Sequence, residues 1–202
     1  MRLPRPIPVL DERAQGRAER RFNRRDWLLG MACFWLAGAW AAAADTGLAA
    51  GEYQIKATYI YKFTKFIDWP PSAFASPNAP IVIGIVGEDP FGKTMDKTVQ
   101  GETLGGRTFV VKRLRADEDL RSCHLLFISR SEKDRLPVML NRLKGSSVLT
   151  VSEIKGFAER GGMINLTIVD NSVKTEINQT AAEQAGLQIS AKLLIRARLV
   201  KS

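Results

Sequence analysis

The pattern of apolar residues after residue 44 predicts helices and strands that alternate along the chain. The segment Glu52–Trp69 carries apolar side chains at helical spacing and is followed by two prolines, which predicts a helix. Short, continuously apolar runs predict strands buried on both faces at Pro80–Val86, Arg107–Val111, His124–Ile128 and Ser147–Val151. Helical stretches are expected between them at Phe91–Val99, Asp117–Arg121 and Glu132–Leu143.

The C-terminal part of the chain follows a different pattern. Met163–Val169 and Ser172–Ile177 are separated by two turn-forming residues, which predicts a β-hairpin. Asn178–Ala185 is expected to form a short helix, and Ser190–Val200 a final amphipathic helix. This order of elements predicts an α/β fold, a three-layer sandwich with a mainly parallel sheet and an antiparallel edge hairpin. No linker or repeat interrupts residues 45–202, which are therefore expected to form a single domain.

The N-terminus has the features of an export signal. Four arginines between Arg20 and Arg25 precede Trp27–Ala44, an uncharged run that ends in four alanines, so residues 1–44 are predicted to be a secretory signal peptide. Asn23–Leu29 also resembles a twin-arginine signal, although an ordinary Sec signal fits almost as well. An uncleaved membrane anchor is the alternative. The basic cluster remains in the cytoplasm in either case, so the remainder is expected in the periplasm.

Composition excludes several classes of function. The net charge is +9, but the first 26 residues hold eight arginines against four acids, so the excess is not spread over the folded part. One histidine and two cysteines are too few for a four-ligand zinc site, and neither a metal nor a cofactor is expected. The basic clusters Lys112–Arg115 and Arg196–Lys201 are not interleaved with aromatic residues, which indicates solvated surfaces and no nucleic-acid partner.

Three loops are candidates for a binding site because they follow parallel strands. The first offers Glu88, Asp89 and Phe91, and the next two offer Arg130 and Glu153. The carboxyl ends of parallel strands meet at one edge, where open α/β sheets bind ligands, so these residues could hold a small anion. The alternative is that the same residues only shape turns. In that interpretation Asp89 caps a helix with Pro90 at its first position, and Ser131 is the N-cap of the next helix.

Two other regions are candidates for contacts with partner proteins. Glu176 and Asn178 end the edge strand of the predicted hairpin, although Asn178 is also a good N-cap for the following helix. Aromatic side chains cover more than one face of the first helix, so some are expected to be exposed and to form an interface, such as that of a homodimer. They are Tyr53, Tyr59, Tyr61, Phe63, Phe66 and Trp69, of which Tyr59 and Phe63 are the chosen candidates.

Residues for catalysis are lacking. His124 is the sole histidine, it begins an apolar strand, and only Cys123 lies beside it, so no triad or metal shell can be assembled. The protein is therefore not expected to be an enzyme. Cys123 is interpreted as a buried, inert small residue, with a redox or intermolecular role as the alternative.

Several motifs, in order, resemble the YfiR family of periplasmic regulators. The resemblance runs from about Glu52 to Val200, nearly all of the predicted domain. The motifs are YIYKFTKFIDWP (59–70), VGEDPFG (86–92), GGRTFVVKRL (105–114), CHLLFISRSE (123–132), LTVSEIKGFAERGGMINL (149–166) and EINQTAAEQAGLQISAKLL (176–194).

This resemblance implies a function that the residues alone do not. A YfiR-like protein represses an inner-membrane diguanylate cyclase of the YfiN type by binding its periplasmic sensor region, which lowers cyclic di-GMP and biofilm formation. An outer-membrane lipoprotein of the YfiB type sequesters the repressor and releases the cyclase. The alternative function, from another class, is a periplasmic small-molecule binding module built around Glu88, Asp89, Arg130 and Glu153.

One departure from the family concerns cysteine. The resemblance implies a disulfide between the cysteine of the CHLLFIS strand and a partner on the strand PIVIGIV, near Gly84. After residue 44 this sequence contains only Cys123. An intramolecular disulfide is therefore not expected once the signal peptide has been removed.

Overall fold

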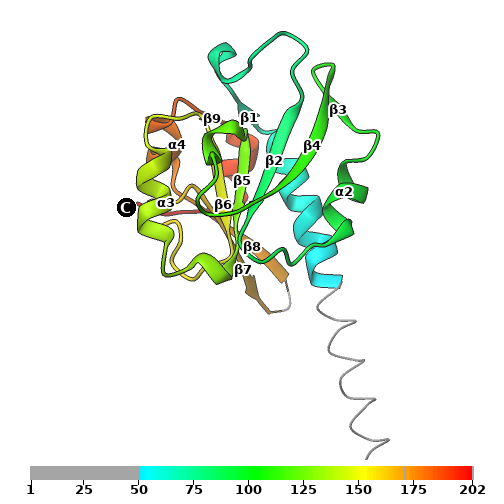
Figure 1. Ribbon diagram of the computed structural model, residues 1–202. Coiled ribbons are helices and arrows are strands. Elements are labelled where there is room, and N and C mark those ends of the chain that lie inside the picture. Colours follow the sequence, from blue (N-terminus) through cyan, green and yellow to red (C-terminus); the bar gives the residue numbers. More distant parts are fainter. Residues whose placement is uncertain (1–50, 171, 202) are drawn as a thin grey trace, which may run out of the picture. The chain divides into compact units, whose positions relative to one another are not determined.

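The computed structural model describes residues 51–170 and 172–201, which are arranged around one large sheet (Figure 1). Within these residues the sheet has eight strands in the order β10-β8-β7-β6-β5-β2-β4-β3. Its centre is parallel, and the antiparallel neighbours are β7 with β8 and β4 with β3. The strands are β2 (Ile81–Val86), β3 (Thr103–Leu104), β4 (Arg107–Leu114), β5 (Leu125–Ile128), β6 (Leu149–Ser152), β7 (Ile164–Val169), β8 (Ser172–Ile177) and β10 (Arg198–Leu199).

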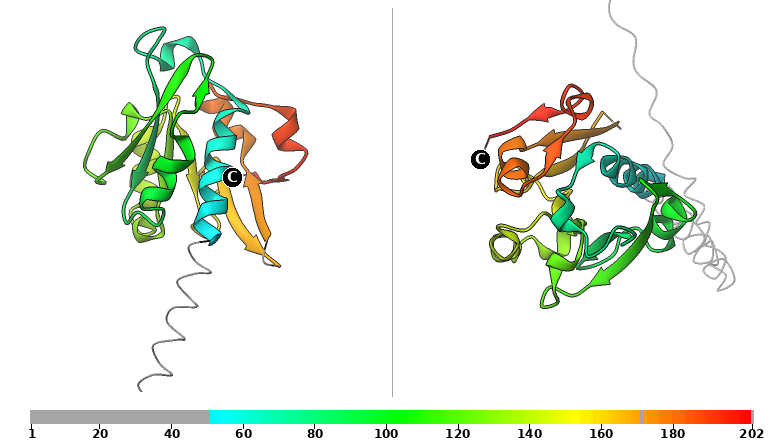
Figure 2. Two further views of the ribbon diagram at one scale, coloured as in Figure 1. Left: turned by 90° about the vertical axis from the view of Figure 1, so that its right-hand side faces the viewer. Right: turned by 90° about the horizontal axis from the view of Figure 1, so that it is seen from above.

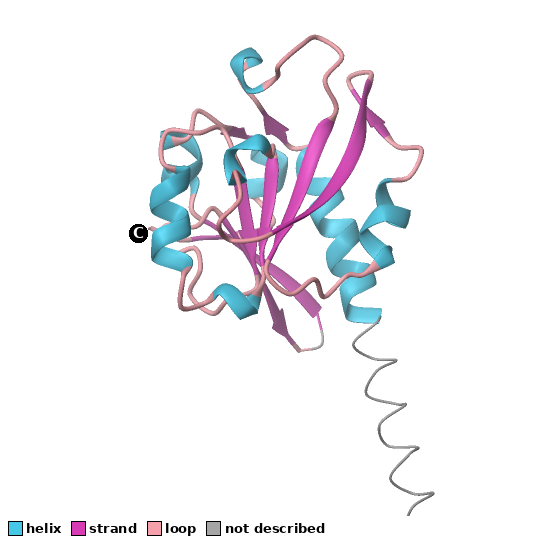
Figure 3. Cartoon of the chain, in the orientation of Figure 1, coloured by secondary structure: helices cyan, strands magenta, loops and turns pink. Residues whose placement is uncertain are grey.

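The central strands are buried on both faces because helices cover both sides of the sheet. In β2 all six residues are buried, with Ile83 and Ile85 in one core and Val82 and Val86 in the other. A helix whose described part spans 51–64 covers the first face together with α2 (Lys93–Val99), and α3 (Leu136–Leu143) covers the second. Figures 2 and 3 show these layers. The predicted three-layer α/β fold is confirmed.

The predicted hairpin is present and sets the shape of the carboxyl end of the sheet, but β8 is not the edge strand, because β10 pairs with it on its outer side. β7 and β8 pair in register from Ile164 with Ile177 to Val169 with Ser172. Asp170, in the turn, has a φ of 49°, which a two-residue hairpin turn requires and aspartate tolerates. β6 pairs with β7 only as far as Asn165, so the last four residues of β7 extend beyond the neighbouring strand.

The chain after the hairpin differs from the predicted pattern. Asn178–Ala185 does contain a helix, α4 (Gln179–Gln184), but the predicted helix Ser190–Val200 is wrong. Only the single turn α5 (Ala191–Leu194) is helical, and the chain then extends as β10, which pairs with β8. The apolar positions satisfied helical spacing, but the Val200 backbone N–H instead donates to Ile177 O at 2.8 Å.

Other helices also begin or end at residues that differ from the predicted ones. The first helix ends at residue 64, and Ile67–Asp68 form the short strand β1, which pairs with β9 (Gln188–Ile189). The helix expected at Asp117–Arg121 is a single 3-10 turn, η2 (Leu120–Ser122). The stretch from Glu132 becomes helical only at Leu136, because the 3-10 turn η3 (Arg130–Glu132) precedes it. A third such turn, η1 (Pro71–Ala73), begins directly after Pro70.

The predicted signal peptide, residues 1–44, lies outside the described residues and remains a prediction. Within the described ranges, no helix has the length and apolar character needed to cross a membrane.

Gly84 is the tightest point between β2 and the segment before β5, which yields a test of the packing. A Cβ at this position would lie 2.5 Å from Cys123 Sγ and 2.9 Å from Leu126 Cδ1, both in the second core. We expect Gly84→Ala to lower the free energy of unfolding by about 1–3 kcal/mol in urea denaturation. Gly51→Ala is the matched control, since no atom lies within 4 Å of its Cβ. Adding Cys123→Ala should restore part of the loss, and equal losses with and without it would contradict this packing.

His124 makes the stability of the domain depend on pH. Its ring is 7% exposed, lies 4.6 Å from the Phe74 ring and accepts a hydrogen bond from Val82 N through Nδ1 (3.1 Å). Burial lowers the pKa of His124, so the unfolded chain binds its proton at a higher pH than the folded protein does. Stability should fall as the pH drops below about 6.5, by at most about 1.4 kcal/mol per pH unit. Urea denaturation from pH 7.5 to 5 should show this slope, and His124→Asn, which keeps an acceptor but does not titrate, should flatten it.

Candidate functional site

The order of the strands brings three loops together at the carboxyl end of the sheet. From β2 the chain moves to β4 on one side and later to β5, β6 and β7 on the other, so the sheet reverses its order beside β2. Ligands of open α/β sheets bind outside the carboxyl ends of the strands at such a point. The loops concerned follow β2, β5 and β6, and they contain the predicted residues Glu88, Asp89, Phe91, Arg130 and Glu153.

The loops after β2 and β5 are held against each other. Glu88 N donates to Ser131 Oγ at 2.9 Å, and a Cβ on Gly87, whose φ is 89°, would lie 2.5 Å from the same oxygen. Only glycine allows this approach. Ser131 was predicted to cap the next helix, but α3 begins five residues later without a side-chain cap, so that expectation is wrong. Ser131 instead ties two loops together across the end of the sheet.

Asp89 shapes its own loop, as the alternative interpretation expected. Its Oδ1 accepts from Phe91 N (2.8 Å) and Gly92 N (3.2 Å), while its Oδ2 accepts from Arg113 Nε (3.0 Å). Because α2 begins only at Lys93, Pro90 is not in the first helical position. Arg113 also binds Asp96 (2.9 Å) and holds the pKa of that carboxyl below its usual value. Asp89 is therefore already engaged within the protein, whereas Glu88 is exposed.

Glu153 is the centre of a buried polar cluster at this end of the sheet. Its side chain is 2% exposed, accepts from Lys56 Nζ and from Tyr53 OH (2.9 Å), and forms an ion pair with Arg130, whose Nε lies 3.1 Å from Oε1. Lys56 is fully buried and also contacts Glu52 one turn earlier in the helix. Burial, together with the charge of Glu153, raises the pKa of Tyr53 to about 12. The cluster joins the first helix to the loops after β5 and β6.

The sequence analysis did not assign Glu52 or Lys56 to a site and named Tyr53 only as an aromatic residue of the first helix, although a signal for Lys56 exists. Lys56, Ile60 and Phe63 recur at helical spacing and all are buried, so Lys56 lies on the apolar stripe of the helix. A lysine on such a stripe needs a buried acid as its partner. The sequence does not reveal which acid that is, because Glu153 lies 97 residues further along the chain.

A pocket of about 540 Å³ opens beside this cluster and is rich in cations. The lining holds four cations and two acids. Glu153 is paired with Arg130 and with Lys56, which also contacts Glu52, so Lys133, Lys155 and Arg160 remain against Asp134. The side chain of Arg130 is 64% exposed, and its Nε is fixed by the buried Glu153. The lining residues are Arg130, Lys133, Asp134, Glu153, Ile154, Lys155 and Arg160.

The aromatic side chains of the first helix point inward more than expected. Phe63 is 2% exposed and Tyr61 is 8% exposed, and the other four are half-buried. Tyr59 packs edge-on against Phe63, with 6.2 Å between the ring centroids. Phe91, 4% exposed, packs between Tyr53 and Phe127. Phe63 and Phe91 therefore belong to the core, and Tyr59 is the one of these candidates that reaches the surface.

The two candidates at the end of β8 also have structural partners. Asn178 is fully buried, its Oδ1 accepts from Ala181 N (3.0 Å) and its Nδ2 donates to Ala158 O (2.9 Å). Its predicted role as N-cap of α4 is confirmed. Glu176 accepts from Asn165 Nδ2 (3.0 Å) and from Arg198 Nε (3.0 Å), so it ties β8 to β7 and β10.

Cys123 lies in the second core, 4% exposed. Burial raises the pKa of its thiol to about 11, which keeps the sulfur protonated and unreactive at neutral pH. Gly84 is its neighbour, at the place where the family resemblance put the partner cysteine.

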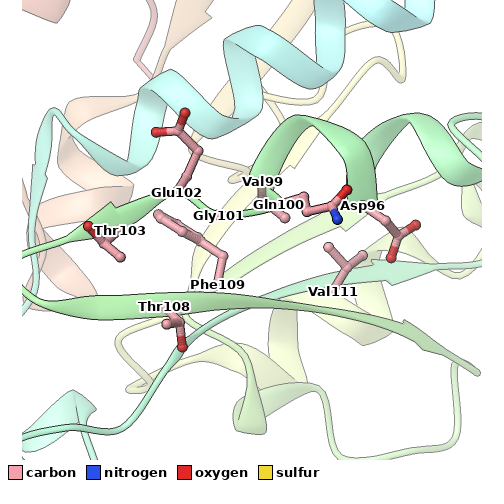
Figure 4. Close-up of a pocket in the computed structure, with 9 residues that line it drawn as sticks. All are labelled: Asp96, Val99, Gln100, Gly101, Glu102, Thr103, Thr108, Phe109 and Val111. Atoms are coloured by element: carbon pink, nitrogen blue, oxygen red, sulfur yellow. The ribbon is translucent and has the colours of Figure 1, made fainter.

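A second hollow, of about 390 Å³, lies at the opposite edge of the sheet between α2 and β4 (Figure 4). Val99, Phe109 and Val111 supply apolar lining, and Asp96 and Glu102 supply acids. Both acids have partners, since Asp96 binds Arg113 and Glu102 accepts from Tyr61 OH. None of the candidate residues from the sequence lines this hollow.

The buried ion pair can be tested by removing one or both charges. Lys56→Met leaves Glu153 buried without its main counter-charge, and we expect the free energy of unfolding to fall by about 3–5 kcal/mol. The double variant Lys56→Met, Glu153→Gln removes both charges and should recover most of this loss in urea denaturation. Lys62→Met, an exposed position in the same helix, is the control. A double variant as unstable as Lys56→Met would show that the pair is not coupled.

Comparison with solved structures found distant likenesses. A conserved domain protein from Vibrio cholerae matches with 15% identity and a TM-score of 0.45, over 59% of this chain and 54% of that one. The ABC domain in complex with L-Trp from Streptococcus pneumonia matches with 13% identity and a TM-score of 0.45, over 59% and 55%. The chain thus spans about half the length of these two structures.

Comparison of the sequence with family models identified the family to which the chain belongs. A search among curated proteins gave no match. The family model described as YfiR/HmsC-like, however, matches residues 53–198, well over half of the chain and nearly all of its described part. This range includes both cores, the buried cluster around Glu153 and the cationic pocket. The chain therefore belongs to the YfiR/HmsC-like family.

Proposed function

We propose that this protein represses an inner-membrane diguanylate cyclase by binding its periplasmic sensor region, which lowers cyclic di-GMP and biofilm formation. The observation that carries the proposal is the family match over residues 53–198. The YfiR/HmsC-like family is a periplasmic, regulatory and non-catalytic family, associated with cyclic di-GMP signalling and with partners of diguanylate cyclases. An outer-membrane lipoprotein of the YfiB type would relieve repression by sequestering the protein, and a homodimer is its proposed form.

The positions of the reactive side chains support binding over catalysis. His124 and Cys123 are buried. Burial lowers the pKa of the imidazole and raises the pKa of the thiol, so both groups favour their neutral forms. Asp89 and Glu153 have their charges satisfied by arginine or lysine inside the protein. A repressor of this kind needs only a surface that binds the inactive conformation of the cyclase better than the active one, because differential affinity is what shifts an equilibrium.

Arg130 is the proposed contact residue on that surface. Its Nε is held by the buried carboxylate of Glu153, while most of its side chain is exposed beside a cationic pocket. An arginine fixed in this way loses little entropy on binding and presents its remaining donors to a carboxylate of the partner. Tyr59, half-buried on the first helix, is the second candidate on the same domain.

The same pocket supports the second candidate function, a small-anion binding module. Its four cations fit an anionic solute, but of the predicted ligands only Arg130 and Glu153 line it. Glu88 and Asp89 belong to the loop that Ser131 and Arg113 hold in place. The repressor function is preferred because the family match bears on it directly.

The repressor function can be tested in the source cell and on its membranes. Deleting the gene should raise cyclic di-GMP, and restoring the wild-type gene should lower it again. Tagged protein should recover a diguanylate cyclase with a periplasmic sensor domain from solubilised inner membranes. Arg130→Gln should weaken this recovery about tenfold or more, as for a central interface arginine.

Arg135→Gln is the matched control for this experiment, because Arg135 is also exposed and makes only a 3.7 Å ion pair with Glu132. Unchanged cyclic di-GMP after deletion, together with no cyclase in the pull-down, would contradict the repressor function. In that case thermal stabilisation by small anions, lost in Arg130→Gln, would favour the binding module.

A further inference from the structure

The β7–β8 hairpin projects from the carboxyl end of the sheet and carries apolar side chains at its tip. β6 pairs with β7 as far as Asn165, so Leu166–Val169 extend past it by about 13 Å at 3.3 Å per residue. Near the turn Ile168 is 43% exposed and Val169 is 47% exposed. Figure 1 shows the hairpin protruding below the other strands.

The first helix begins at the same end. Tyr53 and Lys56 both contact Glu153, which directly follows the last residue of β6, so the first turn of the helix stands beside the end of that strand. Ile55, in this turn, is 51% exposed. Figure 2 (left) shows the beginning of the helix next to the hairpin. Three exposed aliphatic side chains thus lie at one end of the domain.

The cationic pocket lies at this end as well. Arg130 and Lys133 come from the loop after β5, and Lys155 and Arg160 from the loop after β6, the strand that neighbours β7. Lys133 and Lys155 are exposed. Lys56 and Arg130 pair with Glu153, so Lys133, Lys155 and Arg160 leave the lining with an excess of positive charge over Asp134.

The chain also enters the domain at this end. The uncharged run Trp27–Ala44 is separated from Gly51, the first described residue of the helix, by six residues. The exposed aliphatic side chains and the lysine and arginine side chains at this end match the two layers of a membrane surface, the acyl boundary and the anionic phosphates.

We propose that this end of the domain docks on an anionic phospholipid membrane. Ile55, Ile168 and Val169 enter the interfacial layer, and Lys133, Lys155 and Arg160 bind lipid phosphate groups. The contact needs no second protein, and it places the domain against the leaflet in which a membrane partner would stand. It is independent of the proposed repression, since it depends on lipid alone.

The test uses residues 46–202 and vesicles that contain no protein. Every residue of both cores lies between Ala57 and Leu193, so this part folds without the preceding sequence. Omitting residues 1–45 also removes any binding by the apolar run itself. Co-sedimentation is measured with vesicles of phosphatidylethanolamine and phosphatidylglycerol and with vesicles of pure phosphatidylcholine. We expect binding to the anionic vesicles only, and weaker binding as salt is raised.

Paired variants distinguish binding through this surface from nonspecific adsorption to the vesicles. Lys133→Gln with Lys155→Gln should weaken binding about fivefold per charge removed. Ile168→Ser with Val169→Ser should weaken it by a similar factor or more. The first control pair, Lys62→Gln with Lys144→Gln, removes the same charge near the ends of the first helix and α3, away from the proposed face. The second control pair, Ile195→Ser with Leu199→Ser, removes exposed aliphatic side chains in and beside β10. Both control pairs should bind like the wild type.

Three results would overturn the proposal. The first is equal binding to both kinds of vesicle or to neither. The second is equal loss in the control pairs, which would indicate unspecific adsorption. The third is complete displacement by inorganic phosphate, which would identify a site for the free anion instead of a lipid surface. Recovery of a cyclase in the pull-down would stand in all three cases, because that experiment does not depend on lipid binding.

Discussion

The buried ion pair between Lys56 and Glu153 is the interaction on which the functional end of the molecule depends. A fully buried lysine needs a counter-charge, and here the carboxylate that supplies it also accepts from Tyr53 OH and forms an ion pair with Arg130. The pair therefore fixes the beginning of the first helix against β6 and positions the one arginine of the cluster that reaches solvent. Hydrophobic burial holds the sheet together, but it does not specify this geometry.

Across the domain, charged side chains that form internal ion pairs can be distinguished from those that are exposed and free to bind a partner. Asp89 and Asp96 both form ion pairs with Arg113, and Glu176 forms one with Arg198, so these acids stabilise loops and strands. Around the pocket the charges are arranged differently. The buried Lys56 pairs with Glu153, whereas the lysine and arginine side chains of the lining are exposed to solvent. A surface with exposed cations suits recognition of an anionic partner.

Gly84 and Cys123 pack against each other at the place where the resemblance to the family implied a disulfide. Gly84 lies against Cys123 closely enough that even a methyl group would crowd the sulfur. Among the described residues Cys123 is a free, buried thiol, and burial raises its pKa to about 11. Close packing of glycine against the thiol takes the place that the resemblance assigned to a disulfide. After residue 44 the sequence contains no second cysteine, so no disulfide can form within residues 45–202.

The sequence by itself determined the α/β class, the central strands, the hairpin, the Asn178 cap and the family, because each is encoded in contiguous residues whose spacing or motif is local. It also indicated Arg130 and Glu153, since parallel strands must end at one edge. Only the tertiary structure decided that Lys56 is the partner of Glu153, that Ser131 bridges two loops, and that Ser190–Val200 contains one helical turn followed by the strand β10. These features depend on contacts between segments far apart in the chain, and burial and backbone pairing there outweigh local propensity.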